Sequence, residues 1–152
     1  MESVALLKKV RLFQELSDPE IEKFGQATRI QTYAPSQVII EEGAEGRALY
    51  IIKRGTVKVV KIDGEVISEL VKLVAGEHFG EMSLVEDAKT SARVVAHNEV
   101  ECLVISREDF QRILDFNVAI AAKVYKAFTQ SLCDRLRATS SELVTWKPEI
   151  SF

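Results

Sequence analysis

The sequence lacks the features that define several classes of protein. Its 152 residues contain no apolar run long enough to cross a membrane as a helix. The two cysteines, Cys102 and Cys133, form no CxxC motif and are too few to hold an iron–sulfur cluster. The two histidines, His78 and His97, are too few for the converging ligands of a metal enzyme. The sequence therefore predicts no metal, no cofactor and no catalytic activity.

Charge and composition argue against a nucleic acid or a membrane as partner. The net charge of −3 and the pI of about 5.5 disfavour contact with polyanionic surfaces. Residues 1–10 contain only a short apolar stretch that lysine interrupts, which is unlike a secretory signal peptide. We therefore expect a cytoplasmic protein with reduced thiols.

The sequence pattern divides one domain into three segments. Residues 1–28 are predicted to be helical, residues 29–106 to be rich in strands, and residues 107–152 to be helical again. In the first segment, Ser17 followed by Glu20 three residues later is the pattern of a capping box, which predicts the start of a helix.

Short β-branched runs separated by glycines occupy the central segment. Such runs at regular spacing predict a rolled or closed antiparallel sheet. Asp63-Gly64 between two of them predicts a two-residue hairpin. The expected fold is thus mainly β with flanking helices, an antiparallel β-roll of the double-stranded β-helix or jelly-roll type. The runs span residues 38–40, 49–52, 57–62, 66–74, 94–95 and 102–105.

The last segment is predicted to form a C-terminal helical arm. Ser106 is expected to cap its first helix, and the chain from Pro148 onward is expected to be a frayed tail. A long second helix carries an apolar stripe, which fits either packing on the roll or a dimer seam, and the sequence leaves both open. The stripe comprises Ile120, Val124, Phe128, Leu132 and Leu136, widened by Ala121, Ala127 and Leu143.

One segment, residues 76–95, has the order strand, glycine, acidic residue, short helical turn, loop and strand. A helical turn whose free N–H groups follow a glycine is an anion site, because the glycine lets a phosphate approach the backbone. A neighbouring carboxylate accepts hydrogen bonds from ribose hydroxyls. Gly80 and Glu81 stand at these two positions, so the segment suits a nucleoside monophosphate.

The spaced motifs of the chain together resemble the cyclic-nucleotide-binding domains, of the catabolite activator protein and protein kinase regulatory subunit types. The resemblance covers roughly residues 10–140. It implies a β-roll in which a bound ligand repositions the C-terminal helices. The motifs that carry it are Leu12-Phe13, Ile39 to Gly43, Leu49 to Ile52, Gly55 to Val57, Gly76-Glu77, Phe79 to Leu84 and Arg135-Leu136.

The resemblance also assigns roles to residues of the phosphate cassette, residues 79–92. Glu81 is implied to bind the ribose, and the amides of Met82 and Ser83 to meet the phosphate. Three residues of the C-terminal helix are candidates to cap the base. The implied ligand-binding residues are Gly80, Glu81, Met82, Ser83, Thr90 and Ser91, and the base-cap candidates are Tyr125, Phe128 and Arg135.

The cassette departs from the family pattern at Thr90, where the family has the arginine that pairs with the phosphate. A threonine hydroxyl offers one neutral hydrogen bond in place of a charged planar fork. Arg93 lies an odd number of residues along a predicted strand and should face outside the roll, as should Lys89. Glu86 and Asp87 add negative charge. The cassette is therefore interpreted as degenerate.

Structural roles for two cassette residues compete with ligand binding. Gly80 is equally suited to a tight turn, and Glu81 to capping the short helix or pairing with a lysine or arginine across the pocket.

The sequence favours a stand-alone, non-enzymatic regulatory or sensor module for signal transduction. It would bind cAMP or cGMP weakly, or another small ligand, and act on a second copy or a protein partner through its C-terminal helix. The alternative is a ligand-free scaffold that dimerises or binds a partner through the same helix. The residues after Leu136 are too few for a helix-turn-helix, so DNA binding is not predicted.

Overall fold

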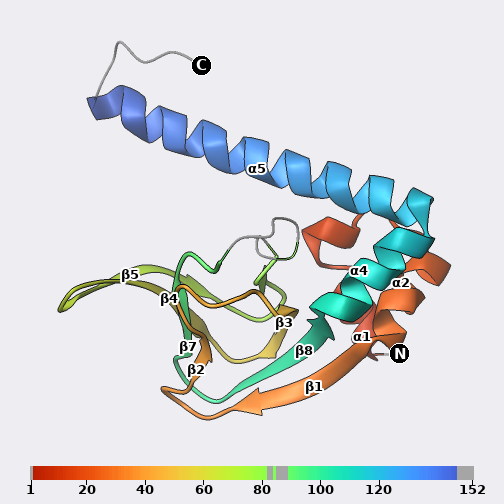
Figure 1. Ribbon diagram of the computed structural model, residues 1–152, viewed down its shortest axis with the longest axis horizontal. Helices are drawn as coiled ribbons and strands as arrows, with labels where there is room; N and C mark the ends of the chain where they lie inside the picture. The colour runs from red at the N-terminus through yellow and green to blue at the C-terminus, as the bar shows by residue number, and fades with distance from the viewer. Residues whose placement is uncertain (1, 82–83, 85–88, 147–152) are drawn as a thin grey trace.

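The computed structural model describes residues 2–81, 84 and 89–146, with helices at both ends of a β-rich middle. Figure 1 shows the N-terminal helices and α4 gathered beside one end of the sheets, while α5 runs back above them. The helical elements are α1 (Glu2–Leu7), the 3₁₀ turn η1 (Arg11–Phe13), α2 (Asp18–Gln26), α4 (Arg107–Phe116) and α5 (Val118–Trp146).

Two four-stranded sheets form the roll, and every strand pair is antiparallel. The expected fold class is confirmed. The first sheet has the order β1-β8-β3-β6, built from β1 (Thr28–Tyr33), β8 (Val100–Ser106), β3 (Ala48–Arg54) and β6 (His78–Phe79). The second has the order β2-β7-β4-β5, built from β2 (Val38–Ile40), β7 (Arg93–Ala96), β4 (Val57–Asp63) and β5 (Val66–Leu73).

Local sequence signals explain where several elements begin. The Ser17 side chain accepts a hydrogen bond from the Glu20 amide while Glu20 bonds back to Ser17, so the predicted capping box is present. Ser106 caps α4 as expected. The predicted hairpin joins β4 and β5, but its loop is one residue later than expected. Asp63 pairs with Val66, and Gly64, at φ +65°, takes the first turn position.

Strand β3 separates two apolar cores because its side chains alternate between the two faces of the first sheet. Leu49 and Ile51 face the helices and pack in a core with Phe13, Phe24 and Phe110 of the helical elements. The next side chains along β3 face the inside of the roll. There Ala48, Tyr50 and Ile52 pack with residues of both sheets, including Phe79 and Val94.

The first half of α5 packs on the helical core, and the packing ends part-way along the helix. Ile120, Val124 and Phe128 are buried there, whereas Leu132 and Leu136 are 37% and 57% exposed. The first half of the apolar stripe therefore packs on the protein's own core, as one of the two expectations has it, and the dimer seam stays a prediction for the exposed second half. The Leu143 side chain lies outside the description. In the part of the chain that is described, no helix combines the length and apolarity needed to cross a membrane.

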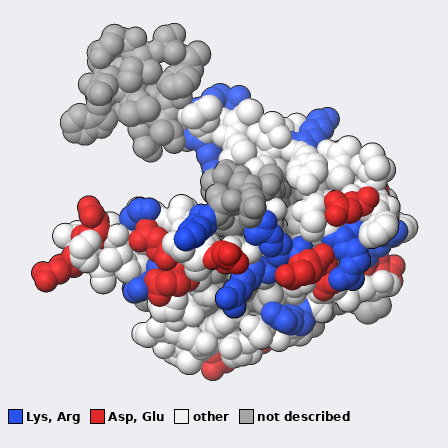
Figure 2. Space-filling model, viewed as in Figure 1, with Lys and Arg blue, Asp and Glu red and all other residues white. Residues whose placement is uncertain are grey.

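Acidic and basic side chains are interspersed over the roll on the face shown in Figure 2. Several form ion pairs. Lys53 on β3 pairs with Glu101 on the neighbouring β8 at 3.1 Å, and Lys61 on β4 pairs with Glu42 in the β2–β3 loop at 2.8 Å. The outer surface is thus solvated and internally paired, as expected for the exposed face of an antiparallel sheet.

Candidate functional site

Gly80 directly follows β6, where the chain leaves the first sheet. Its φ of +91° lies in the left-handed region, and a Cβ on it would stand 2.6 Å from the carbonyl oxygen of Ala48 on β3. Only glycine fits both constraints. The close approach of β6 to β3 therefore gives Gly80 a structural role, whatever else it contacts.

Glu81 follows Gly80 and is almost fully buried, with its side chain 8% exposed. One of its carboxylate oxygens, Oε1, accepts a hydrogen bond from Arg135 of α5 at 3.1 Å. The ring of His78 lies 4.0 Å from the same oxygen. Pairing with an arginine across the pocket, one of the roles considered for Glu81, is present in this structure.

The pKa of His78 is lowered from its usual value, chiefly because the ring is buried. The Glu81 carboxylate opposes this shift by favouring the charged ring, and the Arg135 cation adds to it. His78 is thus held neutral behind the ion pair of Glu81 and Arg135.

Thr90, at the position of the family's arginine, ties β7 to the β2–β3 loop. Its hydroxyl donates to the carbonyl oxygen of Glu41 at 2.5 Å and accepts from the amide of Ala44 at 3.0 Å. Its own amide and carbonyl bond to Ala44 and Gly43 at 2.8 and 2.9 Å. Backbone groups of the β2–β3 loop thus use the hydroxyl both as a donor and as an acceptor. The side chain thereby joins this loop to the segment before β7 and closes the roll at this point.

The basic neighbours of Thr90 lie outside the roll or are exposed. Arg93 lies outside the roll, where its Nε donates to the Glu41 carboxylate at 2.6 Å, as the strand alternation predicts. Lys89 is exposed. Ser91 is exposed and its carbonyl oxygen accepts a hydrogen bond from Lys61 at 2.7 Å.

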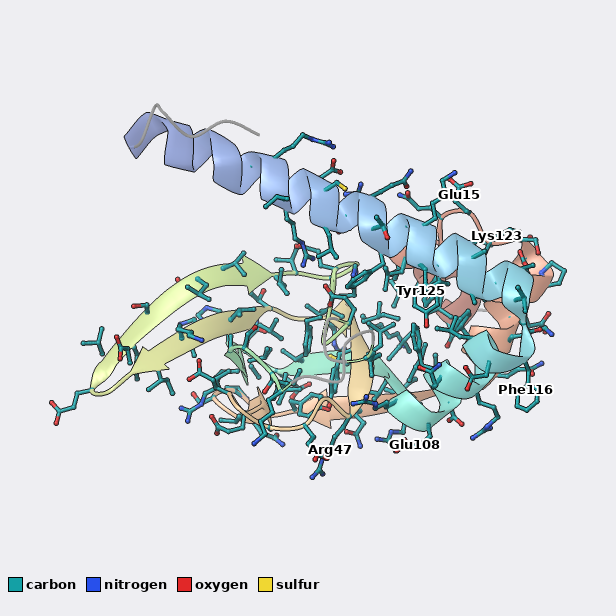
Figure 3. All side chains as sticks on the ribbon, turned by 45° about the horizontal axis from the view of Figure 1, so that its top comes forward. Glu15, Arg47, Glu108, Phe116, Lys123 and Tyr125 are labelled. Atoms are coloured by element: carbon teal, nitrogen blue, oxygen red, sulfur yellow. The ribbon has the colours of Figure 1, made fainter. Side chains whose placement is uncertain are left out.

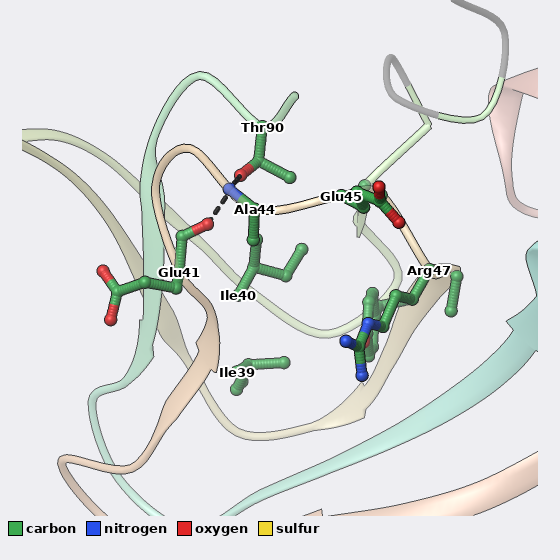
Figure 4. Close-up of a pocket in the computed structure, with 11 residues that line it drawn as sticks. Ile39, Ile40, Glu41, Ala44, Glu45, Arg47 and Thr90 are labelled. Atoms are coloured by element: carbon green, nitrogen blue, oxygen red, sulfur yellow. Dashed lines mark hydrogen bonds between the residues drawn. The ribbon is translucent and has the colours of Figure 1, made fainter. Parts of the chain in front are cut away.

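Two adjoining pockets open beside these residues. Both are walled by Ile40, Gly80 and Thr90. The first, of about 280 Å³, extends under the β2–β3 loop and is drawn in Figure 4. The second, of about 120 Å³, extends under the cassette and includes Glu81 and Ser91. The predicted cassette residues in the described range, Gly80, Glu81, Thr90 and Ser91, therefore converge on the second pocket, which is small and largely apolar.

The base-cap candidates on α5 occupy different environments. Phe128 is buried in the helical core, and Arg135 bonds Glu81. Tyr125 is 40% exposed and is labelled in Figure 3 beside α5. Tyr125 and Arg135 are therefore exposed and lie outside the helical core in this conformation, and Arg135 is bonded to Glu81.

Part of the predicted cassette lies outside the described residues, namely Met82, Ser83, Glu86 and Asp87, as does Pro148. Leu84 is described, and it is buried in the helical core with Val124 and Phe128. The cassette and α5 thus share one apolar cluster in addition to the pair of Glu81 with Arg135. Within the described part of the chain, no three His, Cys, Asp or Glu side chains converge as metal ligands would.

Sequence reasoning did not identify most residues of the larger pocket as site residues, and Arg47 is the one among them that carries a positive charge. It lines the larger pocket together with Tyr50 and Gly80. Its sequence signal was weak, since it is a single arginine between Gly46 and the apolar run of β3.

Comparison with known families decides what this arrangement is. The family described as "Cyclic nucleotide-binding domain" matches residues 30–117, which is more than half of the chain. The chain belongs to the cyclic nucleotide-binding domain family. The resemblance drawn from the spaced motifs is confirmed. Domains of this family are regulatory parts of larger proteins such as protein kinases.

Individual relatives agree with this assignment. The cGMP-dependent protein kinase 2 of Homo sapiens is 37% identical over 109 residues, which are 70% of this chain and 14% of the kinase. The chain thus corresponds to a small part of that relative. The catabolite activator protein of Thermus thermophilus has 29% identity and a TM-score of 0.78, over 90% of this chain and 63% of that one.

A third relative is similar to this chain in sequence and fold to a comparable degree. The regulatory subunit of a cAMP-independent protein kinase A from Trypanosoma brucei has 25% identity and a TM-score of 0.73, over 86% of this chain and 44% of that one.

Proposed function

We propose that this cyclic nucleotide-binding domain is a non-enzymatic regulatory module whose pocket takes a small ligand and whose response is carried by α5. The observation that carries the proposal is the ion pair between Glu81 of the cassette and Arg135 of α5. A ligand hydroxyl that bonds to Glu81 would compete with Arg135, so occupancy of the pocket and the position of the helix are coupled.

The apolar contacts of the cassette support this coupling. Leu84 packs in the same core as Val124 and Phe128 of α5, so a shift of the cassette would disturb the packing of the helix. A ligand shifts such an equilibrium only by its difference in affinity for the two arrangements. Contact with Glu81 in one arrangement and not the other supplies that difference.

The ligand we propose is a weakly bound cAMP or cGMP, or another small molecule of similar size. The names of the relatives give precedent for both cases, since one is a cGMP-dependent kinase and another is called cAMP-independent. Weak binding is expected because Thr90 replaces a charged fork and its hydroxyl is already engaged. We further propose that the protein acts in the cytoplasm, consistent with its two unpaired cysteines.

Titration calorimetry with cAMP and cGMP tests the proposal. Three proteins are compared: the parent, Thr90→Arg and Glu81→Gln. Binding by the parent that weakens in Glu81→Gln would support the pocket as the ligand site. A hydrogen bond to a charged group is worth about 1.5–3 kcal/mol, so a loss of about tenfold or more is expected.

The Thr90→Arg variant separates a missing clamp from a closed pocket. Binding by this variant alone would mean that the pocket is intact and lacks only a charge. If neither the parent nor Thr90→Arg binds either nucleotide, the proposal that this pocket takes a cyclic nucleotide is rejected.

A second function is favoured by the exposed end of the α5 stripe. Leu132 and Leu136 are separated by one helical turn and lie beyond the last core contact of α5. A ligand-free scaffold that dimerises through this stripe is therefore the alternative. Sedimentation equilibrium of the parent against Leu132→Glu tests it, with Tyr125→Glu as the matched control on the same helix. A dimer that only Leu132→Glu dissociates would support the scaffold, and a monomeric parent would reject it.

A further inference from the structure

Arg47 differs from most arginines of this protein in having no partner for its charge. Among the residues that the structure describes, its guanidinium forms no ion pair and no side-chain hydrogen bond. Arg29, which lines a neighbouring surface pocket with it, shares this property. By contrast, most other arginines pair with carboxylates, namely Arg11, Arg54, Arg93, Arg112, Arg135 and Arg137.

Arg47 borders the larger pocket at the end opposite Thr90. Figure 4 shows the Thr90 side chain at one end, bonded to the β2–β3 loop, and the Arg47 guanidinium at the other. Between them lie the apolar side chains of Ile39 and Ile40 and the ring of Tyr50. The pocket thus has one cationic end, and it is the end away from β7.

Tyr50 adds a hydrogen-bond donor to the same pocket, which it lines together with Arg47. Its ring stacks on Phe79 with centroids 4.9 Å apart, which fixes its orientation. Burial raises the pKa of Tyr50, and the charges of Arg29 and Arg47 oppose that rise. No hydrogen bond of the hydroxyl is found within the described residues, so it remains available to a ligand.

The backbone that carries Arg47 is held in place by the start of α4. The amide of Arg107 donates to the carbonyl oxygen of Arg47 at 2.8 Å, and the Arg107 guanidinium donates to that of Gly46 at 3.3 Å. These bonds hold the backbone of Arg47 at the pocket rim. They also connect it directly to α4, by a path that does not involve the cassette.

We propose that Arg47, with the hydroxyl of Tyr50, binds the anionic group of the pocket's ligand and so replaces the arginine that is absent at position 90. The ligand class is a small organic anion, with one phosphate or carboxylate group at Arg47 and a flat or apolar part against Ile39, Ile40 and Tyr50. The inference rests on the proposed function, because it specifies how the same pocket holds its ligand.

Two carboxylates, those of Glu41 and Glu45, belong to residues that line the pocket and would oppose an anion there. The Glu41 carboxylate is bound by Arg93 and points away from the pocket in Figure 4. Glu45 lies two residues before Arg47 in the loop and also lines the pocket. Removal of its charge should therefore strengthen the binding of an anion.

The test is titration calorimetry with cAMP as the anionic probe and adenosine as the uncharged one. Arg47→Gln should weaken cAMP binding about tenfold, the low end for a charge-assisted pair because Arg47 is exposed, and should leave adenosine binding unchanged. Glu45→Gln should strengthen cAMP binding severalfold. Arg54→Gln is the matched control, because it removes the same charge at the other end of β3, where Arg54 pairs with Glu101.

The outcomes separate this inference from the proposed function. If the parent binds cAMP and Arg47→Gln binds it equally well, the inference is overturned while the pocket stands. If only Thr90→Arg binds cAMP, the pocket is still the ligand site, but Arg47 does not bind the anionic group. If neither the parent nor Thr90→Arg binds either probe, both are rejected.

Discussion

Replacing Thr90 by valine should destabilise the protein even though no ligand is bound. Valine keeps the shape of threonine and removes only the hydroxyl, which bonds the carbonyl of Glu41 and the amide of Ala44. Each lost hydrogen bond costs about 1 kcal/mol net, and the two backbone groups are near enough to the surface to regain water. We therefore expect the free energy of unfolding to fall by about 2 kcal/mol.

Urea and thermal unfolding followed by circular dichroism measure this change. For a chain of this length, about 2 kcal/mol corresponds to a fall in Tm of roughly 4–8 °C. The slope of the free energy against urea should not change, because the backbone bonds of Thr90 to Gly43 and Ala44 keep the loop attached.

Two variants control for other effects of the substitution. Thr90→Ser keeps the hydroxyl and should lose less than Thr90→Val. Thr129→Val removes a hydroxyl that bonds the carbonyl of Tyr125 within α5, and its effect should be small because that carbonyl is part of the helical ladder. A Thr90→Val protein within about 0.5 kcal/mol of the parent would refute the view that this hydroxyl closes the roll.

Three further predictions follow from the site and its surroundings. In urea unfolding, Gly80→Ala should lose at least ~2 kcal/mol more stability than Gly64→Ala, because both glycines have positive φ but only at Gly80 would the added Cβ collide with backbone. Equal losses in the two variants would contradict the close approach of β6 to β3. The free energy of unfolding of the parent should fall as the pH drops below about 6.5, because the lowered pKa of His78 makes the unfolded chain take up the proton first. His78→Gln should lose less stability between pH 7 and 5, and an equal loss in both proteins would contradict the burial of the ring. Burial raises the pKa of Cys102 to about 12, so a chromogenic disulfide reagent at mildly alkaline pH should titrate only Cys133 in the native protein and both thiols in denaturant.

Local signals allowed much of the fold to be predicted from sequence. The capping box at Ser17 and the cap at Ser106 depend on residues three positions away, so the sequence contains the whole interaction. The outward placement of Arg93 follows from alternation along one strand. The hairpin loop shifted by one residue because strand pairing continued through Asp63, and pairing depends on the partner strand as well as on the turn.

The chemistry of the pocket was less predictable, because its partners lie far apart in the chain. The resemblance predicts that Thr90 departs from the family pattern, but it does not predict the bonds of Thr90, which reach Glu41 and Ala44 in the β2–β3 loop. A cationic partner for Glu81 was considered, whereas Arg135 was expected to contact a base. The position of Arg47 depends on how the β2–β3 loop meets α4, and no periodicity in the sequence encodes that contact.

The nested pairing of the strands has a consequence for how the chain can fold during its synthesis. β1 pairs with β8, and β2 pairs with β7, so the earliest strands find their partners among the latest. Such distant pairings are slow, because a long loop must close before any contact forms. On the ribosome, β4 and β5 can form their hairpin early, whereas β1 must wait with its backbone unpaired until residues 100–106 have emerged.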